Sequence, residues 1–196
     1  MAVTTRRATS LPPGLSFRIA DLAHDFGTLE RRFDLANNRP MPVAYRFLDR
    51  WVIPAAIERV YDAIGDPLSY ECWWTDFVIR ASGDAGPPTP GKRNELLVKA
   101  YLPYKVNFGL EVIEAEAPSR ILSRLSKDFD GTGLWTLEET AAGTEATLDW
   151  RPSVNHPLIK HLTPVLRPLF RSNHNWAMRR GERQLREYLR RGEDGA

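Results

Sequence analysis

The chain has 196 residues, of which 42% are hydrophobic and 27% charged, and its formal net charge is +2. This composition is ordinary for a globular protein with one domain and a core of its own. The single cysteine, Cys72, excludes an intramolecular disulfide and a cysteine-based metal cluster. No stretch approaches the roughly 20 apolar residues of a membrane span, and the N-terminus lacks the apolar core of a signal peptide. We therefore expect a soluble, cytoplasmic protein.

Residues 1–40 are interpreted as an N-terminal extension. Met1–Gly14 is small, polar and proline-bearing, which predicts disorder. Apolar residues then recur at helical spacing and predict a short helix over residues 16–35. The residues with this spacing are Ile19, Leu22, Phe26, Leu29 and Phe33.

The body of the protein begins at Met41 with a strand and two helices. Apolar and polar residues alternate over 43–53, which predicts a half-buried strand, and Asp49 lies on its apolar side. A carboxylate on that side is either at a solvated end or paired with a buried partner. Pro54 then begins a predicted helix that Gly65 ends, and a short second helix follows over 67–73.

The next part of the chain alternates apolar and polar residues in six short segments. We predict strands around 77–79, 96–102, 104–112, 121–125, 134–139 and 146–150, with a loop over 86–91. Consecutive strands joined by short turns favour an antiparallel sheet with one apolar face. Helices on one side of such a sheet give an α+β architecture.

A long amphipathic helix is predicted over 169–191. One face carries arginines, and the other is apolar and includes Phe170, Ala177, Gly181, Leu185 and Tyr188. His174 brings a polar ring onto this apolar face. Gly181 lies at its centre, where glycine permits a close approach of a sheet or a ligand to the helix backbone. The pattern is typical of a packed core face, and it also fits a helix that covers a cavity.

Several segments resemble the polyketide cyclase/dehydrase branch of the START-like (SRPBCC, helix-grip) superfamily. After the strand Tyr45–Ile53, the chain reads Pro-Ala-Ala-Ile-Glu-Arg-Val-Tyr at 54–61, where this family begins a helix. Ser-Tyr-Glu-Cys-Trp-Trp at 69–74 is similar to the family's second helix. The segments 131–137 and 170–178 complete the resemblance. It implies a START-like domain over 41–191, followed by a flexible tail over 192–196.

The resemblance implies a curved antiparallel sheet of about seven strands that grips the long C-terminal helix around a hydrophobic cavity. Such a cavity would hold a polyketide-like, lipid-like or other flat apolar molecule. Each aromatic residue either lines this cavity or belongs to the packed core. The predicted lining residues are Trp73, Phe77, Phe108, Trp135, Trp150 and His174.

Catalysis is open at this point. Family members that act as aromatase/cyclases use a pocket arginine with a tyrosine or serine, and this pair has no match here. The pattern suggests one acid–base pair, Asp49 and His174. Tyr45 or Tyr188 is a candidate third member. The alternative interpretation is a plain structural hydrogen bond between Asp49 and His174. The four histidines show no metal-ligand spacing, so we expect neither a metal nor another cofactor. They are His24, His156, His161 and His174.

Three functions remain in competition. The first is a cofactor-independent polyketide cyclase/aromatase, and the second is a non-catalytic lipid or quinone carrier. The third is an interaction module that uses the arginines of the last helix, Arg179, Arg183, Arg186 and Arg190. A solvated face is the plain interpretation of these arginines, and transient contact with an anionic membrane or an acidic carrier protein is the alternative. Nucleic acid is not expected as a partner, because no aromatic residues alternate with the arginines. Residues 156–168 are interpreted as a mobile flap or a short helix at the cavity mouth, or equally as an ordinary connection.

Overall fold

The computed structural model describes residues 33–34, 39–40, 45–101, 104–154 and 157–194. The disorder expected for residues 1–14 and most of the helix expected over 16–35 lie outside these residues. The last part of that predicted helix is extended instead. Phe33–Asp34 forms strand β1, which pairs antiparallel with β2, Arg39–Pro40.

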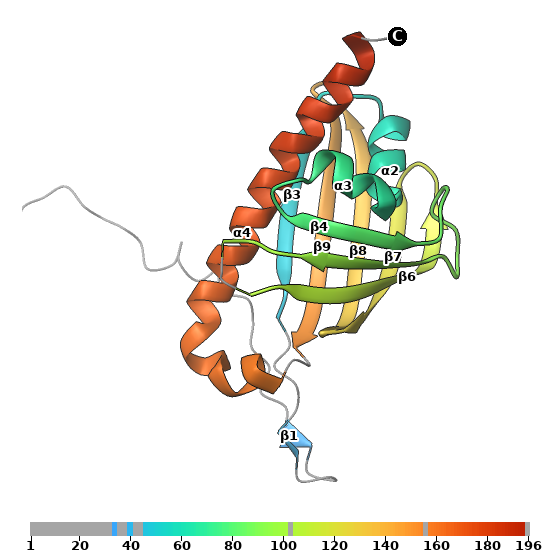
Figure 1. Ribbon diagram of the computed structural model, residues 1–196. Coiled ribbons are helices and arrows are strands. Elements are labelled where there is room, and N and C mark those ends of the chain that lie inside the picture. Colours follow the sequence, from blue (N-terminus) through green and yellow to red (C-terminus); the bar gives the residue numbers. More distant parts are fainter. Residues whose placement is uncertain (1–32, 35–38, 41–44, 102–103, 155–156, 195–196) are drawn as a thin grey trace, which may run out of the picture.

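The main sheet has seven antiparallel strands. They are β3 (Phe47–Ile53), β4 (Val78–Gly83), β5 (Arg93–Val98), β6 (Val106–Glu116), β7 (Arg120–Lys127), β8 (Phe129–Thr140) and β9 (Gly143–Val154). Their order is β3-β9-β8-β7-β6-β5-β4, so every strand from β4 to β9 lies beside the next one in the chain, and β3 closes the series next to β9. This confirms the predicted meander. The strands curl into a half-barrel with α4 across its open side (Figure 1).

The helices are α2 (Ile57–Gly65), the 3-10 turn η1 (Pro67–Ser69), α3 (Tyr70–Trp73) and α4 (Pro157–Asp194). Residues 157–168, expected as a flap or short helix, form the first turns of α4, which bends there in Figure 1. Prolines at 164 and 168 lack the N–H that a helix interior needs, which accounts for the bend. The helix continues to Asp194, although a tail was expected from residue 192.

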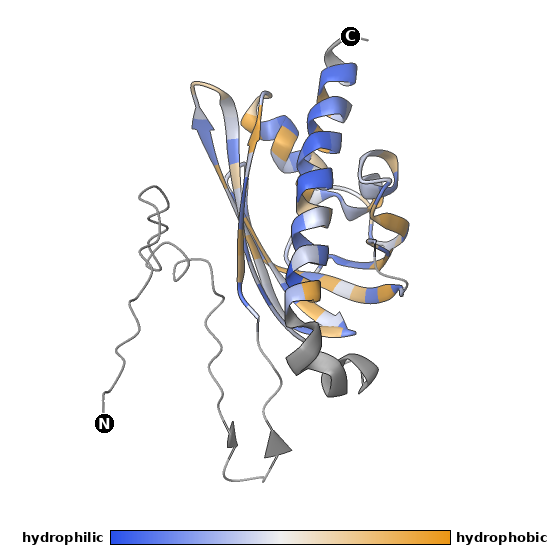
Figure 2. Cartoon of the chain, turned by 90° about the vertical axis from the view of Figure 1, so that its left-hand side faces the viewer, coloured by the Kyte–Doolittle hydropathy of each residue, from blue (hydrophilic) through white to orange (hydrophobic). Residues whose placement is uncertain are grey.

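α4 packs against the sheet through one side, and Figure 2 shows it lying along a single face. Ala177, Met178, Leu185 and Leu189 are buried on this side. Tyr188, expected on the buried face, is 39% exposed, and Leu189 takes the inward place. Near its end the helix packs on α2, where the Arg59 side chain donates to the Leu189 carbonyl oxygen at 2.7 Å.

At Gly181, α4 approaches the core closely. A Cβ atom at this position would lie 2.7 Å from the Trp74 ring and 2.9 Å from the Trp51 ring. The Trp74 indole also donates from Nε1 to the Ala177 carbonyl oxygen at 3.2 Å. The glycine therefore admits two tryptophans, and the close approach foreseen from the sequence is made by the protein's own core.

Candidate functional site

A cavity of about 170 Å³ lies between α4 and the inner face of the sheet. Its walls come from the sheet strands, from the segment between α2 and β4, and from the middle of α4. Five of the six predicted lining residues face it, and they are Phe77, Phe108, Trp135, Trp150 and His174. Most of the remaining lining is apolar, including Leu96, Val98, Ile121, Leu148 and Met178.

Trp73 is the exception among the predicted lining residues. It is buried beside the cavity wall, where its ring packs on Tyr70 at 4.8 Å and stacks on Trp74 at 5.3 Å between centroids. Its Nε1 donates to the Ser69 hydroxyl at 3.1 Å. Trp74 lines the cavity in its place. The two tryptophan rings stack on each other, and only Trp74 lines the cavity, which the sequence alone does not show.

The aromatic wall is held by ring contacts between strands. Phe108 of β6 meets Trp150 of β9 at 5.8 Å and Phe129 of β8 at 6.0 Å between centroids. A Cβ atom on Gly133 would lie 2.8 Å from the Trp150 ring, so this glycine provides the space that the indole fills. Such edge and tilted packing fixes ring orientations and leaves a pre-formed apolar wall.

Tyr104 contributes a buried polar atom to the cavity. It lies just before β6 and lines the cavity near Phe170 of α4, with 6.3 Å between ring centroids. Among the described residues its hydroxyl oxygen is buried and has no hydrogen-bond partner. Burial, with smaller contributions from Tyr101 and Tyr45, raises the pKa of Tyr104 to about 12. The phenol is therefore neutral near pH 7 and able to donate a hydrogen bond.

The sequence contained a signal for Tyr104 that periodicity alone does not use. Tyr104 shares the apolar side of its strand with Val106 and Phe108. A hydroxyl on a core-facing position requires a partner, because an unpaired buried polar group costs about 1–3 kcal/mol. That requirement marks the residue as a candidate for ligand contact.

Asp49 and His174, the predicted acid–base pair, do meet. His174 Nε2 lies 2.6 Å from Asp49 Oδ2, and the two side chains are 17% and 15% exposed. The Phe47 ring stacks on the imidazole at 4.1 Å between centroids. An ionised carboxylate only accepts hydrogen bonds, so Nε2 carries the proton in this pair. Of the two tyrosines suggested as a third member, Tyr45 lines the cavity and Tyr188 is exposed on the outside of α4.

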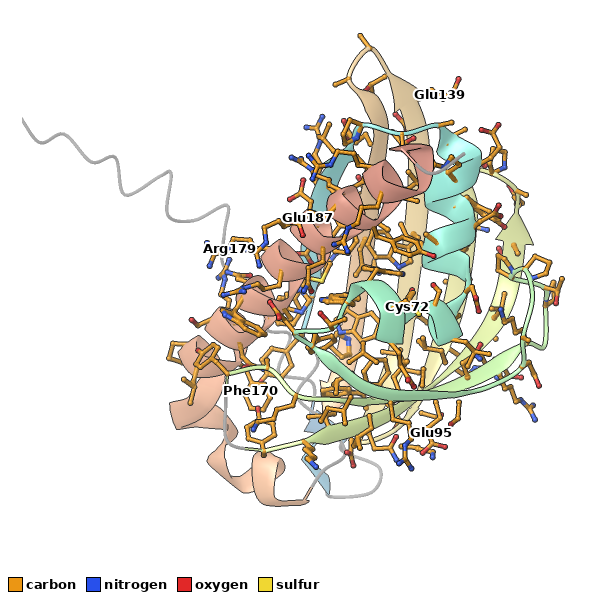
Figure 3. The ribbon with its side chains drawn as sticks, turned by 45° about the horizontal axis from the view of Figure 1, so that its top comes forward. Cys72, Glu95, Glu139, Phe170, Arg179 and Glu187 are labelled. Atoms are coloured by element: carbon orange, nitrogen blue, oxygen red, sulfur yellow. The ribbon has the colours of Figure 1, made fainter. Side chains whose placement is uncertain are left out.

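The arginines of α4 have acidic neighbours. Arg183 lies 3.6 Å from Asp76, and Arg186 pairs with Glu182 at 2.6 Å. Arg179 is exposed and lies on the outer side of the helix in Figure 3. The charge of the face is thus partly offset, and contact with an anionic partner stays a prediction.

Two further findings concern metal sites and membrane spans. Nowhere in the described chain do three or more His, Cys, Asp or Glu side chains come close enough to hold a metal ion. His24 and His156 lie outside the described residues, and the side chain of His161 is likewise undescribed. Within the same part of the chain, each helix is too short or too polar to cross a bilayer.

A curled antiparallel sheet closed by a long C-terminal helix over an apolar cavity defines a helix-grip protein of the START-like superfamily. The chain belongs to the family described as "polyketide cyclase / dehydrase and lipid transport", whose model matches residues 47–190. Family and fold together indicate a domain of the hydrophobic-ligand-binding type. The polyketide cyclase/dehydrase resemblance is thereby confirmed.

Several solved structures share the fold. Protein CV1439 from Chromobacterium violaceum is 21% identical, with a TM-score of 0.53 over 75% of this chain and 97% of that one. Protein Ms6760 from Mycobacterium smegmatis is 17% identical, with a TM-score of 0.52 over 84% and 98% of the two chains. The protein TTHA0849 from Thermus thermophilus is 20% identical, with a TM-score of 0.52 over 72% and 96%. At these identities the likeness shows the fold alone. No curated protein matched the sequence.

Proposed function

We propose that the protein binds a flat, mostly apolar molecule of polyketide or lipid type, which carries an oxygen at one end. The observation that carries this proposal is the apolar cavity with the buried Tyr104 hydroxyl, which has no hydrogen-bond partner among the described residues. An apolar wall selects the body of the ligand by burial, and a buried donor at one end selects its orientation.

The size of the cavity supports a ring-sized ligand. An engineered apolar cavity of about 150 Å³ holds benzene, and the cavity here measures about 170 Å³. Two of its tyrosines, Tyr104 and Tyr45, both approach the Phe170 ring and place their phenols at that end. A ligand would therefore place its oxygen at this end and its rings among Phe108, Trp135 and Trp150.

A matched pair of probes tests both parts of the proposal. β-Tetralone and tetralin have the same fused rings, and only β-tetralone has a carbonyl oxygen. We expect both to bind, as measured by isothermal titration calorimetry. Tyr104→Phe should raise the Kd for β-tetralone about fivefold, because a hydrogen bond contributes about 1 kcal/mol. The same variant should leave the Kd for tetralin unchanged.

Tyr101→Phe is the control for this experiment. Tyr101 is 45% exposed, and its hydroxyl donates to the Leu169 carbonyl oxygen at 3.5 Å outside the cavity lining. This variant should bind both probes as the wild type does. Failure of both probes to bind the wild type would refute an open cavity, and equal losses for the two probes in Tyr104→Phe would refute the assigned orientation.

A polyketide cyclase/aromatase-type activity is the second candidate, and one observation favours it over a carrier. His174 lines the cavity and is paired with Asp49, which provides an acid–base group without any cofactor. Incubation with a linear poly-β-ketone, followed by mass spectrometry, separates the two functions. Loss of water with ring formation supports a cyclase, and recovery of unchanged ligand supports a carrier.

A further inference from the structure

We propose that Asp49 and His174 form a proton relay through the wall of the cavity. This relay removes a proton from the carbon atom next to the carbonyl group of a bound ligand. The inference rests on the proposed function and deepens it, because it names the ligand class as a ketone with acidic α-hydrogens. His174 is the catalytic residue in this account. Asp49 is a positioning residue that acts through His174.

The pair connects two separate spaces. His174 lines the inner cavity, and Asp49 does not. Asp49 lines a second, polar groove of about 160 Å³ on the outside of the β3–α4 contact, and His174 does not. Their hydrogen bond of 2.6 Å thus crosses the wall between the cavity and the outer groove.

The periodicity of α4 explains this arrangement. At about 100° per residue, Asn175, Arg179 and Glu182 fall on a different face of the helix from Phe170, His174 and Ala177. The first three residues line the outer groove and the second three line the cavity. His174 therefore faces the cavity, and its half-buried carboxylate partner on β3 faces the outer groove.

The hydrogen bond also assigns the roles of the two ring nitrogens. In the neutral imidazole that donates from Nε2 to Asp49, Nδ1 carries no proton and keeps its lone pair. Within the described part of the chain, Nδ1 makes no hydrogen bond, and the Phe47 ring covers one face of the imidazole. An imidazole nitrogen with an accessible lone pair at the edge of an apolar cavity is suited to act as a base.

The chemical step balances without any further reactant. The ligand's α C–H bond breaks and its proton goes to His174 Nδ1. The C–H electron pair forms the carbon–carbon double bond of an enolate, and the carbonyl oxygen takes the charge while Tyr104 donates a hydrogen bond to it. The negative charge of Asp49 stabilises the imidazolium. The Nε2 proton can then exchange through Asp49 with water in the groove, which Arg50, Arg179 and Glu182 also line.

Hydrogen exchange at the α-carbon of β-tetralone in D₂O tests the relay, with deuterium uptake followed by NMR. The wild type should accelerate the exchange above the buffer rate. His174→Gln keeps an amide in place of the ring but has no basic nitrogen, and it should slow the enzymatic exchange about a hundredfold. Asp49→Asn should slow it at least tenfold while the Kd for β-tetralone stays at the wild-type value. A residue with a merely structural role would change the Kd or the folding and not the rate alone.

Glu145→Gln is the matched control for Asp49→Asn. It removes one negative charge from the same edge of the sheet, where Glu145 pairs with Arg50 on the outside. Its exchange rate should equal that of the wild type. If His174→Gln does not fold, Asp49→Asn decides the question.

The outcomes separate the relay from the binding function. Binding of β-tetralone without accelerated exchange overturns the relay and leaves the ligand-binding function standing. Accelerated exchange that survives in both His174→Gln and Asp49→Asn also overturns it. Absence of binding by β-tetralone and by tetralin overturns the binding function itself, and the relay with it.

Discussion

Gly181→Ala tests the packing that joins α4 to the sheet. The new methyl group would meet the rings of Trp74 and Trp51 at 2.7–2.9 Å, well inside normal contact. Over-packing of this kind costs about 1–3 kcal/mol. A shift of the Trp74 ring that breaks its hydrogen bond to the Ala177 carbonyl oxygen costs about 1 kcal/mol more. The higher helix propensity of alanine stabilises the variant by about 1 kcal/mol, so we expect the free energy of unfolding to fall by about 1–3 kcal/mol in total.

Urea unfolding followed by tryptophan fluorescence and circular dichroism measures this change in the free energy of unfolding. Gly192→Ala is the control, since it makes the same substitution on the same helix. There the new Cβ atom meets only the end of the flexible Arg59 side chain, at 3.1 Å. Its stability should stay unchanged or rise by up to about 1 kcal/mol. A Gly181→Ala protein as stable as Gly192→Ala would refute the tryptophan contact.

Two further variants test other parts of the account. Leu185→Ala should lower the free energy of unfolding by about 2–5 kcal/mol, because Leu185 of α4 is fully buried against the core. A loss below about 1 kcal/mol in urea unfolding would contradict this prediction. Hydrogen bonds from Arg151 and Arg46 lower the pKa of Asp149 from 3.8 to about 2. The folded pKa lies below the unfolded one, so this contribution is present above about pH 4 and is lost as the pH falls toward about 2. Wild type and Asp149→Asn should therefore differ in urea midpoint above that window and converge below it, and a constant difference would contradict the assignment.

Periodicity and turn residues predicted an antiparallel sheet with helices, and the family resemblance predicted that the curved sheet grips the C-terminal helix. The six later segments predicted the meander β4–β9, the alternation over 43–53 predicted β3, and helical spacing predicted most of α4. Boundaries were less accurate. β4 runs on from the expected 77–79 to Gly83, where its partner β5 provides hydrogen bonds that a short sequence pattern does not reveal.

The site was predicted in part, and the failures have physical reasons. Asp49 and His174 were foreseen because each is a polar residue on an apolar face, which demands a partner. Trp73, predicted as a lining residue, is buried beside the cavity wall, because the orientation of a one-turn helix depends on its tertiary contacts and not on periodicity. Tyr104 was missed because strand alternation treats tyrosine as an apolar residue, although its hydroxyl is buried.

A crystal structure of the protein with β-tetralone tests the central claim most directly. The account predicts that the fused rings lie between Phe108, Trp135 and Trp150. The carbonyl oxygen should lie within hydrogen-bonding distance of the Tyr104 hydroxyl. Side chains that fill the space between α4 and the sheet, with the probe absent or bound only at the surface, would contradict it.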